Sequence, residues 1–545
     1  MSSDSDDDDV PLCSLAKRSR TTEEPITEER QTEPSTSSSA PIISRPSAVP
    51  FVDPTVPNNE KYIWRNRHNP RDQLEWQENQ GPRYPQTPVY YFDCMFGDGV
   101  IDLLVTYTNI YATQKNKVGN VTSSEMKCFL GILLYSGYIV VPRRYMYWDK
   151  SSDTDFSIVY NAMSRDRFTF IMTHLHCCDN TQIATESDKF AKMRPLFNML
   201  NEIFLNMAPL EEVYSIDEAM VPYYGGHSCK QFIRGKPIRW GYKFWVGATR
   251  LGYVLWFDPY QGHAAIIPSV YRQLGLGAGV VLRFADYLQF RHPDAPFHLF
   301  FDNFFSSVPL FHELTKRGLK ATGTIREDRT KKCPLPSNKE FKKTERGTFK
   351  YKSSQPGHIL VCKWNDNSVV TVASNSETIE PLHKAKRFSQ QQKKYILIDQ
   401  PAIIKSYNQN MGGVDRSDQN IGLYRTSVRG KKWYFSLFSH CLDMAIHNAW
   451  QLYKSNGGEY DHLLFRRTVA RGILETHKKS EKRGPCPTPR TYRETSRYDK
   501  IDHLIEYNDS QLRCWLCKKN TNFTCQKCKI YLHPKSCFVT YHTPT

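Results

Sequence analysis

The sequence predicts a multidomain α/β protein, and two features indicate this class. The chain has 545 residues, of which 39% are hydrophobic and 13% aromatic. Single hydrophobic cores stop growing at about 250–300 residues, so this apolar material is expected to divide among several cores. The spacing of apolar residues also changes along the chain, from helical periods to short β-rich runs and back to helical periods. A mixed sheet flanked by helices, with further domains, is therefore expected.

The first segment, residues 1–58, has an acidic run followed by Ser, Thr, Pro and Glu with few large apolar side chains. Such a composition buries too little surface to offset the entropy of ordering, so a disordered acidic arm is expected. Within it, Lys17-Arg18-Ser19-Arg20 fits a nuclear-import signal, although a short basic cluster is also compatible with solvated charge. A nuclear location is the prediction.

Residues 59–212 are expected to be the first part of a helical domain, because the apolar spacing from about Tyr90 is mostly helical. The most apolar stretch, residues 128–141, is interrupted by Gly and Ser and lacks the roughly 18 uninterrupted apolar residues of a membrane span. It predicts a buried helix, and no membrane partner is expected. The N-terminus does not resemble a secretory signal, which again favours the cytosol or nucleus.

Residues 213–330 alternate between strand and helix patterns in the order β-β-β-α-β-α-β. The β-rich runs begin at Val213, Tyr242, Gly252, His298 and Lys320, and the helical stretches at Val280 and Val308. This order is typical of a mixed sheet flanked by helices. Residues 331–398 then alternate as strands between Pro-Gly and Asn-Asp-Asn turns, which predicts an inserted β-rich domain. Helical patterns return in 399–418 and 419–490.

Aspartates mark two strands of this predicted sheet and one helix after it. Asp217 closes the first strand and Asp302 the fourth, and in a sheet of this order the two strand ends are neighbours. Carboxylates that share a site are costly unless a cation neutralises them, and Mg²⁺ prefers oxygen ligands. Asp415 and Asp418 follow paired glycines at a spacing that places both on one helix face. Together they could hold two Mg²⁺ ions about 3.5–4 Å apart for in-line displacement at phosphorus.

An alternative interpretation gives each aspartate a local role. Asp217 would cap a turn, Asp302 would open a helix, and Asp415 with Asp418 would lie in an exposed first turn. This suffices for any single aspartate. It does not explain why the acidic elements arise in one coherent β-β-β-α-β order, with each strand aspartate following apolar residues.

The stretches around these aspartates resemble the piggyBac family of DNA transposases. The resemblance spans roughly residues 90–542 and is carried by residues 208–223, 230–243, 301–307, 320–326 and 412–419. It implies an RNase H-like catalytic domain, formed by 213–330 and 399–418 and interrupted by the β-rich insertion. By the same resemblance, Asp217, Asp302 and Asp415 are catalytic metal ligands, and Asp418 is a further required aspartate. Residues 59–212 and 419–490 would form a split helical domain for dimerisation and DNA binding.

Family members cut double-stranded DNA at transposon ends, form and reopen a hairpin, and insert at TTAA sites. The resemblance therefore implies a Mg²⁺-dependent transposase that acts as a homodimer on transposon ends and a TTAA target. Two alternatives from other classes stay open. One is a domesticated, sequence-specific DNA-binding protein without transposition activity. The other is a chromatin reader whose zinc domain binds a histone tail or another protein.

Basic residues are in excess, with a formal net charge of +17, which suits binding to phosphate backbones. The candidate DNA-binding residues form two clusters: Lys230, Arg234, Lys236 and Arg239, which Lys243 extends, and Arg425, Arg429, Lys431, Lys432 and Trp433. The first cluster interleaves with the aromatic residues Phe232, Trp240, Phe244 and Trp245, whose faces suit unstacked bases. For each residue alone, a core or solvated position explains it equally well.

The tail, residues 500–545, is rich in cysteine and histidine, and a reducing compartment disfavours disulfides. Its candidate metal ligands are Cys514, Cys517, Cys525, Cys528, His533, Cys537 and His542. Two Cys-x2-Cys pairs at this spacing predict tetrahedral Zn²⁺. The alternative is that the cysteines are simply reduced and buried, and it requires two such pairs to occur close together by chance. Because one site takes four ligands, two structural Zn²⁺ ions in a cross-brace are expected. His503 is the candidate eighth ligand, or alternatively a surface histidine.

Overall fold

The computed structural model describes residues 49–57, 59–66, 75–76, 85–151, 153–183, 188–262, 267–478, 498 and 503–543. Most of the predicted arm, including Lys17–Arg20, lies outside the described residues. Residues 49–57, which were expected to be disordered, instead pack against the protein. The backbone N–H groups of Thr55 and Val56 donate to Glu313 Oε2 at 2.8 and 3.0 Å, and Val56 is buried. A buried carboxylate thus holds a stretch whose composition alone indicated disorder.

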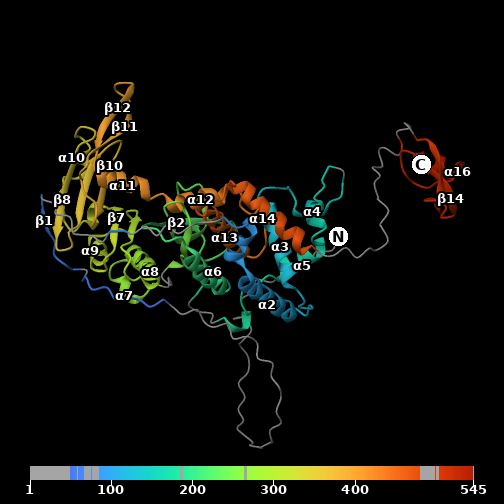
Figure 1. Cartoon of the computed structure of the whole chain (residues 1–545), viewed down its shortest axis with the longest axis horizontal. Coiled ribbons are helices and arrows are strands. Elements are labelled where there is room, and N and C mark those ends of the chain that lie inside the picture. The colour runs from blue at the N-terminus through green and yellow to red at the C-terminus, as the bar shows by residue number, and fades with distance from the viewer. Residues whose placement is uncertain are drawn as a thin grey trace, which may run out of the picture. The chain divides into compact units, whose positions relative to one another are not determined.

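A ten-stranded mixed sheet forms the centre of the fold (Figure 1). Its strands are β1 (Ile63–Arg65), β2 (Val213–Pro222), β3 (Gln231–Phe232), β4 (Trp240–Thr249), β5 (Val254–Pro259), β6 (His298–Phe301), β7 (Lys320–Thr324), β8 (Phe349–Gln355), β9 (Leu360–Asn365) and β10 (Val369–Ser374). They lie in the order β1-β8-β9-β10-β7-β6-β2-β4-β3, with β5 beside β4. The pairs β2–β6 and β6–β7 are parallel, and the other pairs are antiparallel. The predicted mixed sheet is confirmed, with the short β3 added.

Residues 331–398, predicted to be an inserted β-rich domain, contain strands, and three of these strands join the central sheet. β10 pairs with β7, so that β8, β9 and β10 continue the central sheet. The physical reason is that β7 would otherwise be an edge strand with unpaired backbone groups. β1, in a part of the chain expected to be helical, pairs with β8 at the far edge. Among the strands that follow β7 as far as Gln400, only β11 (His383–Ser389) and β12 (Lys394–Gln400) stay outside the central sheet, as a two-stranded hairpin.

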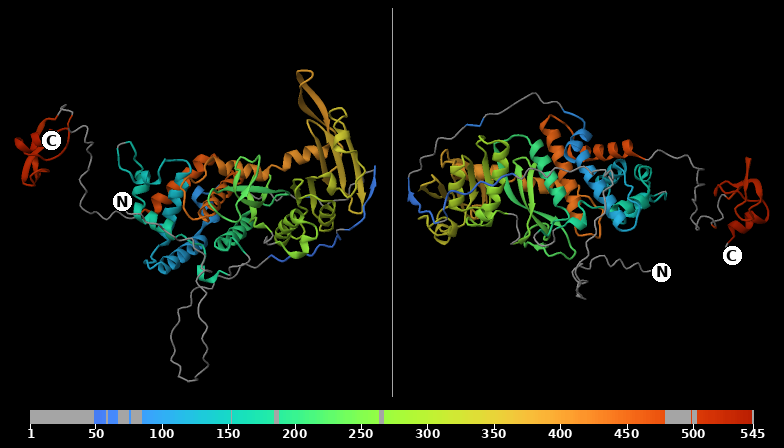
Figure 2. Two further views of the ribbon diagram at one scale, coloured as in Figure 1. Left: turned by 180° about the vertical axis from the view of Figure 1, so that it is seen from behind. Right: turned by 90° about the horizontal axis from the view of Figure 1, so that it is seen from below.

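Helices cover the sheet and build a helical layer beside it (Figure 2). Those that follow or connect sheet strands are α7 (Ser269–Arg272), α8 (Leu276–Arg291), α9 (Val308–Lys316), α10 (Asn338–Phe341), α11 (Ala402–Asn410) and α12 (Gly413–Leu423). The helical layer contains α1 (Pro88–Phe96), α2 (Asp98–Gln114), α3 (Ser123–Ser136), α4 (Ser157–Tyr160), α5 (Arg165–His174), α6 (Arg194–Met207), α13 (Phe435–Ser455) and α14 (His462–His477). Short 3₁₀ turns are η2 (Arg144–Trp148), η3 (Asn180–Gln182) and η5 (Glu327–Arg329). Within the described part of the chain, no helix has the length and apolar character to cross a membrane.

The helical layer joins two parts of the chain that the sheet separates in sequence. α14 packs on α3, and α13 packs on α1. α3 begins with a capping box between Thr122 and Glu125. Gly131 lets α14 approach closely, because a Cβ there would lie 3.0 Å from side-chain atoms of Ile473 and Leu474. Of residues 128–141, which were expected to form a buried helix, residues 128–136 are the mostly buried part of α3, whereas the helix ends at Ser136 and Val140 beyond it is exposed.

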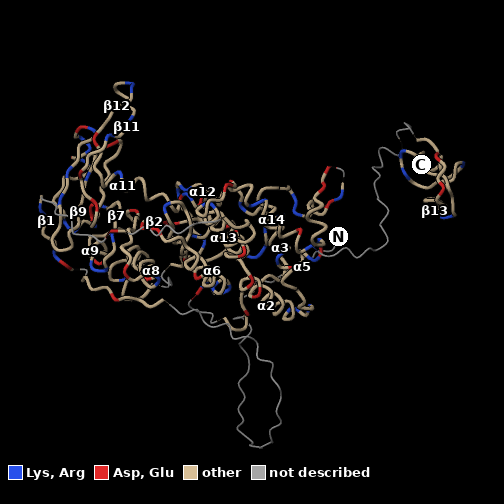
Figure 3. Tube along the Cα trace, in the orientation of Figure 1, with Lys and Arg blue, Asp and Glu red and all other residues tan. Residues whose placement is uncertain are grey.

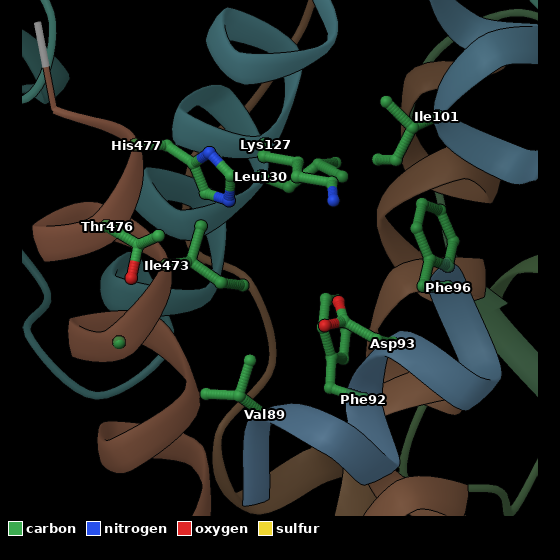
Figure 4. A pocket seen from close by; sticks show the side chains of 11 residues that line it. Val89, Phe92, Asp93, Phe96, Ile101, Lys127, Leu130, Ile473, Thr476 and His477 are labelled. Atoms are coloured by element: carbon green, nitrogen blue, oxygen red, sulfur yellow. The ribbon is translucent and has the colours of Figure 1, made fainter. Parts of the chain in front are cut away.

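A small cavity of about 120 Å³ remains between α1, α3 and α14 (Figure 4). Its walls are mostly apolar, with Phe92, Leu130 and Ile473 among them. Lys127 at its edge is paired with Asp98 at 2.9 Å. None of the residues that line this cavity is a predicted catalytic, DNA-binding or zinc-binding residue.

A buried ion pair holds the helical layer together. Arg466 on α14 and Asp443 on α13 are 1% and 0% exposed, and Arg466 Nη2 lies 2.8 Å from Asp443 Oδ1. Arg466 Nε also donates to the Leu134 carbonyl of α3 at 3.1 Å. The backbone N–H and hydroxyl of Thr426 donate to the Asp443 carboxylate. The pair thus connects three helices and the segment before α13.

We expect Arg466→Ala to lower the free energy of unfolding by about 3–5 kcal/mol, because Asp443 would keep a buried and unpaired carboxylate. Urea unfolding followed by circular dichroism measures this loss. Arg471→Ala, on the same helix, is the matched control, since Arg471 pairs with Glu475 in the exposed position typical of a pair worth less than about 1 kcal/mol. Equal losses in the two variants would contradict the role given to the buried pair.

Candidate active site and metal centres

The parallel pairing of β2 and β6 brings Asp217 and Asp302 together. Ile216 and Phe301 are the last residues in register, so the two aspartates follow at the same point of neighbouring strands. Asp302 comes directly after β6, as predicted. Asp217 does not close its strand, nor does it cap a turn, because β2 remains paired with β4 as far as Pro222. The prediction that β2 ends at Asp217 was wrong. The register of β2 and β6 nevertheless makes Asp217 and Asp302 neighbours, as predicted.

Asp415 and Asp418 lie on α12, which packs against β2 and β4. Asp415 is in the exposed first turn, and Asp418 is partly buried one turn later. The preceding glycine pair was expected to permit close approach, and Gly413 does so. A Cβ on Gly413 would lie 2.2 Å from the Thr249 carbonyl oxygen, whereas Gly412 has open space around it.

Acidic charge is concentrated between β2 and β6. Burial and the neighbouring Glu218 raise the pKa of Asp217 to about 7, and Asp302 adds to this. Burial also raises the pKa of Asp302, and Glu218 adds to the rise, while the Phe304 N–H, which donates to Asp302 Oδ1 at 2.8 Å, opposes it. Partly buried carboxylates that raise one another's pKa are stabilised by a cation in their midst.

Asp418 links the helix to this acidic region. Burial raises its pKa to about 6 and Asp415 adds to the rise, while Arg425 and Lys236 lower it. Both cations were predicted to bind DNA. The structure instead places them beside the carboxylates, and Lys236 Nζ also lies 3.9 Å from Glu218.

Sequence reasoning did not assign Lys243 and Glu218 to the acidic site. Lys243, predicted to extend a DNA-binding cluster, is largely buried, with Nζ 3.8 Å from Glu218 Oε2. Its ammonium lies 4.1 Å from the ring centroid of Trp245 and 4.9 Å from that of Phe304. Burial lowers the pKa of Lys243, and the surrounding carboxylates oppose this. The available signal was that Glu218 directly follows the first aspartate.

Tyr407 on α11 is a further residue that sequence reasoning missed, and it connects all three acidic elements. Its hydroxyl lies 3.5 Å from Thr324 Oγ1. Burial, and then the charges of Asp302, Asp217 and Asp415, raise the pKa of this phenol to about 12. Carboxylates from β2, β6 and α12 therefore act on one side chain. No sequence pattern around Tyr407 indicated this position.

The oxygen donors of this site suit a hard cation such as Mg²⁺. They are less tightly gathered than the Cys/His groups of the tail. Among the described residues, sets of three or more ligand atoms all within 4.8 Å of one another occur only in that tail. A pair of ions about 3.5–4 Å apart takes its ligands from a wider area than one ion does.

The C-terminal tail contains β13 (Ile505–Arg513), β14 (Asn520–Cys525) and α16 (Ser536–His542). It forms two groups of four side chains that could hold zinc: Cys514, Cys517, His533 and Cys537, and His503, Cys525, Cys528 and His542. The groups interleave along the chain, as expected of a cross-brace. His503 completes the second group, so the surface alternative for this histidine is not supported.

Distances in both groups match tetrahedral zinc. Cys517 Sγ lies 3.3 Å from His533 Nδ1, and Cys528 Sγ lies 3.3 Å from His542 Nε2 and 3.5 Å from His503 Nδ1. Zinc–sulfur bonds of about 2.3 Å and zinc–nitrogen bonds of about 2.0–2.1 Å, at tetrahedral angles, place such atoms roughly 3.5 Å apart.

Hydrogen bonds orient the histidines of both groups. His542 Nδ1 donates to the Phe538 carbonyl at 2.8 Å, and His533 Nε2 donates to the Asn520 carbonyl at 3.2 Å. Each bond leaves the other ring nitrogen unprotonated and directed at the sulfur ligands, which is the usual arrangement around a bound metal. Although burial opposes it, hydrogen bonds from neighbouring backbone amides lower the pKa of the Cys514 thiol to about 6, which favours the thiolate that binds metal.

In the first predicted DNA-binding cluster, some residues are exposed and others contact neighbouring parts of the protein. Arg234 and Arg239 are exposed. Lys230 donates to the Gly225 carbonyl at 2.8 Å, and its ammonium lies over the ring of Trp240. Of the interleaved aromatics, Phe244 and Trp245 are buried, whereas Phe232 and Trp240 are 52% and 44% exposed.

The second cluster divides in the same way. Arg429 and Lys431 are exposed. Arg425 lies beside Asp418, and Lys432 lies over the Tyr111 ring at 4.6 Å. Trp433 is partly buried and packs against His227, with ring centroids 4.3 Å apart. Lys432 and Trp433 thus both contact aromatic rings of other segments, which the spacing of the cluster did not indicate.

Comparison with known proteins assigns the family. A family model described as Transposase IS4 matches residues 87–450. Human PiggyBac transposable element-derived protein 3 is 49% identical over 459 residues, which are 84% of this chain and 76% of that protein. Human PiggyBac transposable element-derived protein 2 is 44% identical over 458 residues, again 84% and 76%. The chain belongs to the piggyBac transposase family. The resemblance inferred from its motifs is thereby confirmed.

A solved piggyBac transposase has the same fold. Its synaptic complex with hairpin DNA matches this piggyBac-family chain with a TM-score of 0.59 at 20% identity, covering 84% of this chain and 100% of that one. The family model contains all four acidic positions, from Asp217 to Asp418, and ends before the Cys/His tail. The assignment of metal ligands in the tail therefore rests on its own geometry.

We expect Gly413→Ala to destabilise this piggyBac-family protein by at least about 1–3 kcal/mol, because the added Cβ would collide with the backbone of β4 and displace α12. The midpoint of thermal unfolding measures the effect. Gly412→Ala is the matched control and should cost less than about 1 kcal/mol, since open space surrounds that position. If Gly413→Ala unfolds at the wild-type temperature, the close packing of α12 on β4 is not required.

Proposed function

We propose that this protein is a metal-dependent DNA transposase of the piggyBac type, which excises and integrates DNA at TTAA sites. Asp217, Asp302 and Asp415 would hold two Mg²⁺ ions. One observation carries the proposal: Asp217 and Asp302 follow the last paired residues of the parallel strands β2 and β6, and α12, which bears Asp415, packs against β2. Family membership and the hairpin-DNA complex of the structural relative support it.

The chain's own residues would divide the work at this site. When bound, the cations supply an activated water or 3′-hydroxyl and stabilisation of the leaving oxygen. Asp217 and Asp302 provide oxygen ligands from rigid strands, and Asp415 provides one from the first turn of α12. Asp418 would support the site from α12, three residues after Asp415, with its charge offset by Arg425 and Lys236. Lys243, fixed beside Glu218, keeps positive charge next to the acidic cluster.

The partner would be double-stranded DNA, at transposon ends and at a TTAA target. The exposed cations Arg234, Arg239, Arg429 and Lys431 suit contacts to its phosphates. A homodimer would present two active sites to the two ends of one transposon. The site of action would be the nucleus, with Lys17–Arg20 as the import signal.

The tail would bind two Zn²⁺ ions, one in each Cys/His group. With four protein ligands in each group, no coordination position is left for water, so the role of these ions would be structural. The metal would stabilise a unit of few residues whose apolar core consists largely of its own cysteines.

A second candidate function is sequence-specific DNA binding without transposition. It is favoured by the names of the two human relatives, which describe proteins derived from a transposable element. The presence of all four aspartates, in elements that pack together, favours the enzyme. Binding and cleavage measured on one DNA distinguish the two.

Asp302→Asn is expected to bind a duplex carrying the terminal repeats that flank its own gene, yet to lose nicking at the TTAA junction, because an amide is a poor ligand for the metal. Gel shift and denaturing gel assays on the same duplex measure the two properties. Asp294→Asn, an exposed aspartate, is the control and should keep both. Full nicking by Asp302→Asn would refute the metal-site assignment, and a wild-type protein that binds but never nicks would favour the second function.

Mass spectrometry of the purified chain is expected to find two zinc ions per molecule. Cys517→Ala and Cys528→Ala should each leave one, because the two residues belong to different groups, and the double variant should leave none. Cys94→Ala, a partly buried cysteine of α1, should keep both. Loss of both ions from either single variant would show that the two groups do not bind independently.

A further inference from the structure

The β11–β12 hairpin is the part of the insertion whose strands do not pair with the central sheet. Its strands pair from His383 and Gln400 at the base to Ser389 and Lys394 at the turn. It projects beyond the strands of the large sheet in Figure 1 and in the left view of Figure 2. A two-stranded ribbon on its own is marginally stable, so its base must be held by the rest of the protein.

One face of the hairpin supplies that anchor. Ala385 and Ile398 are buried in the small core around Trp364, whose indole N–H donates to the Asp399 carbonyl at 2.8 Å. Arg387 on the same face pairs with Asp366 at 2.8 Å. The ribbon is therefore fixed at a defined angle to the sheet by packing and by a charged hydrogen bond.

The opposite face is exposed and combines aromatic with basic side chains. Because side chains alternate along a strand, this face carries Lys384, Lys386 and Phe388 from β11, and Tyr395, Leu397 and Asp399 from β12. Phe388, Tyr395 and Leu397 are 44%, 64% and 65% exposed. The Lys386 ammonium lies 4.8 Å from the Tyr395 ring centroid, and Phe388 meets the same ring edge-on at 5.5 Å.

The charge of the hairpin is strongly unbalanced. Residues 383–400 contain five Lys and Arg residues and one acidic residue, which pairs with Lys384. For Lys386, Lys393 and Lys394 the described part of the chain offers no ion-pair partner. The turn, residues 390–394, is fully polar and exposed, with three glutamines followed by two lysines. Basic residues are visible at this tip in Figure 3.

We propose that the exposed face and turn of the β11–β12 hairpin bind duplex DNA. The major groove, about 12 Å wide, admits a two-stranded ribbon. Lys386, Lys393 and Lys394 would contact phosphates, and the glutamines of the turn would reach base edges in the groove. The proposal rests on DNA being the partner, as the proposed function holds, and adds a contact surface outside both basic clusters recognised in the sequence. The unpaired positive charge favours a polyanion over a second protein.

The test compares two triple variants of the full-length chain. The hairpin variant is Lys386→Gln, Lys393→Gln and Lys394→Gln. The control removes the same charge from three exposed lysines at α10 of the same insertion, Lys339, Lys342 and Lys343. Fluorescence anisotropy on a labelled duplex that contains a TTAA site gives the slope of log K against log salt concentration. The slope of the hairpin variant should fall by about 0.9 for each lost phosphate contact, and that of the control should not change.

The outcomes separate this proposal from the proposed function. A hairpin variant with the wild-type slope, when wild type binds the duplex, would overturn the hairpin surface and leave the transposase proposal standing. A wild-type chain that binds no duplex would overturn both. Circular dichroism shows whether the variants fold as the wild type does. As an independent measurement, a photo-crosslinking residue at Tyr395 should attach to the duplex, and one at the exposed Val118 should not. Attachment of Tyr395 to a second copy of the chain instead would contradict DNA binding by this face.

Discussion

The parallel pairing of β2 with β6 is the constraint on which the site depends. β2 lies inside the sheet, with β6 on one side and β4 on the other, and α12 packs against it. One strand therefore sets the positions of three acidic elements that are far apart in sequence. Its register with β6, from Val213 to Ile216, determines that Asp217 and Asp302 are neighbours. A shift of one residue would turn the side chain of Asp217 to the other face of the sheet.

Buried charges fasten the distant segments that surround this sheet. Arg466 and Asp443 join α14 to α13, and Arg466 also binds the Leu134 carbonyl of α3. Glu313 of α9 accepts hydrogen bonds from the backbone of Thr55 and Val56. Each of these carboxylates has several hydrogen-bond donors, which is what makes its burial tolerable. In the acidic site the carboxylates lack such a full set of donors, and burial raises the pKa of Asp217 and Asp302 instead.

The chain carries two kinds of metal-ligand chemistry in separate parts. The sheet and α12 offer carboxylate oxygens, which suit hard cations, and Lys236 and Lys243 lie close to Glu218 beside them. The tail offers thiols and imidazoles in two compact groups, with the histidine tautomers set by backbone carbonyls. An open, oxygen-rich site is suited to chemistry on phosphate, and a closed sulfur-rich site is suited to holding a fold. The donor atoms thus distinguish the part proposed to react from the part proposed to be structural.

Local patterns in the sequence determined the alternation of strands and helices in residues 213–330, the end of β6 at Asp302, and the types of ligand in the tail, because periodicity and spacing act over a few residues. Only tertiary structure decided which elements meet. β2 continues past Asp217 because β4 pairs with it, and β8 to β10 join the central sheet because β7 needs a partner. The assignment of ligands to the two Cys/His groups, and the placement of Tyr407 among the carboxylates, depend on long-range packing. Such packing is set by many weak contacts between distant residues, and no single stretch of sequence contains them.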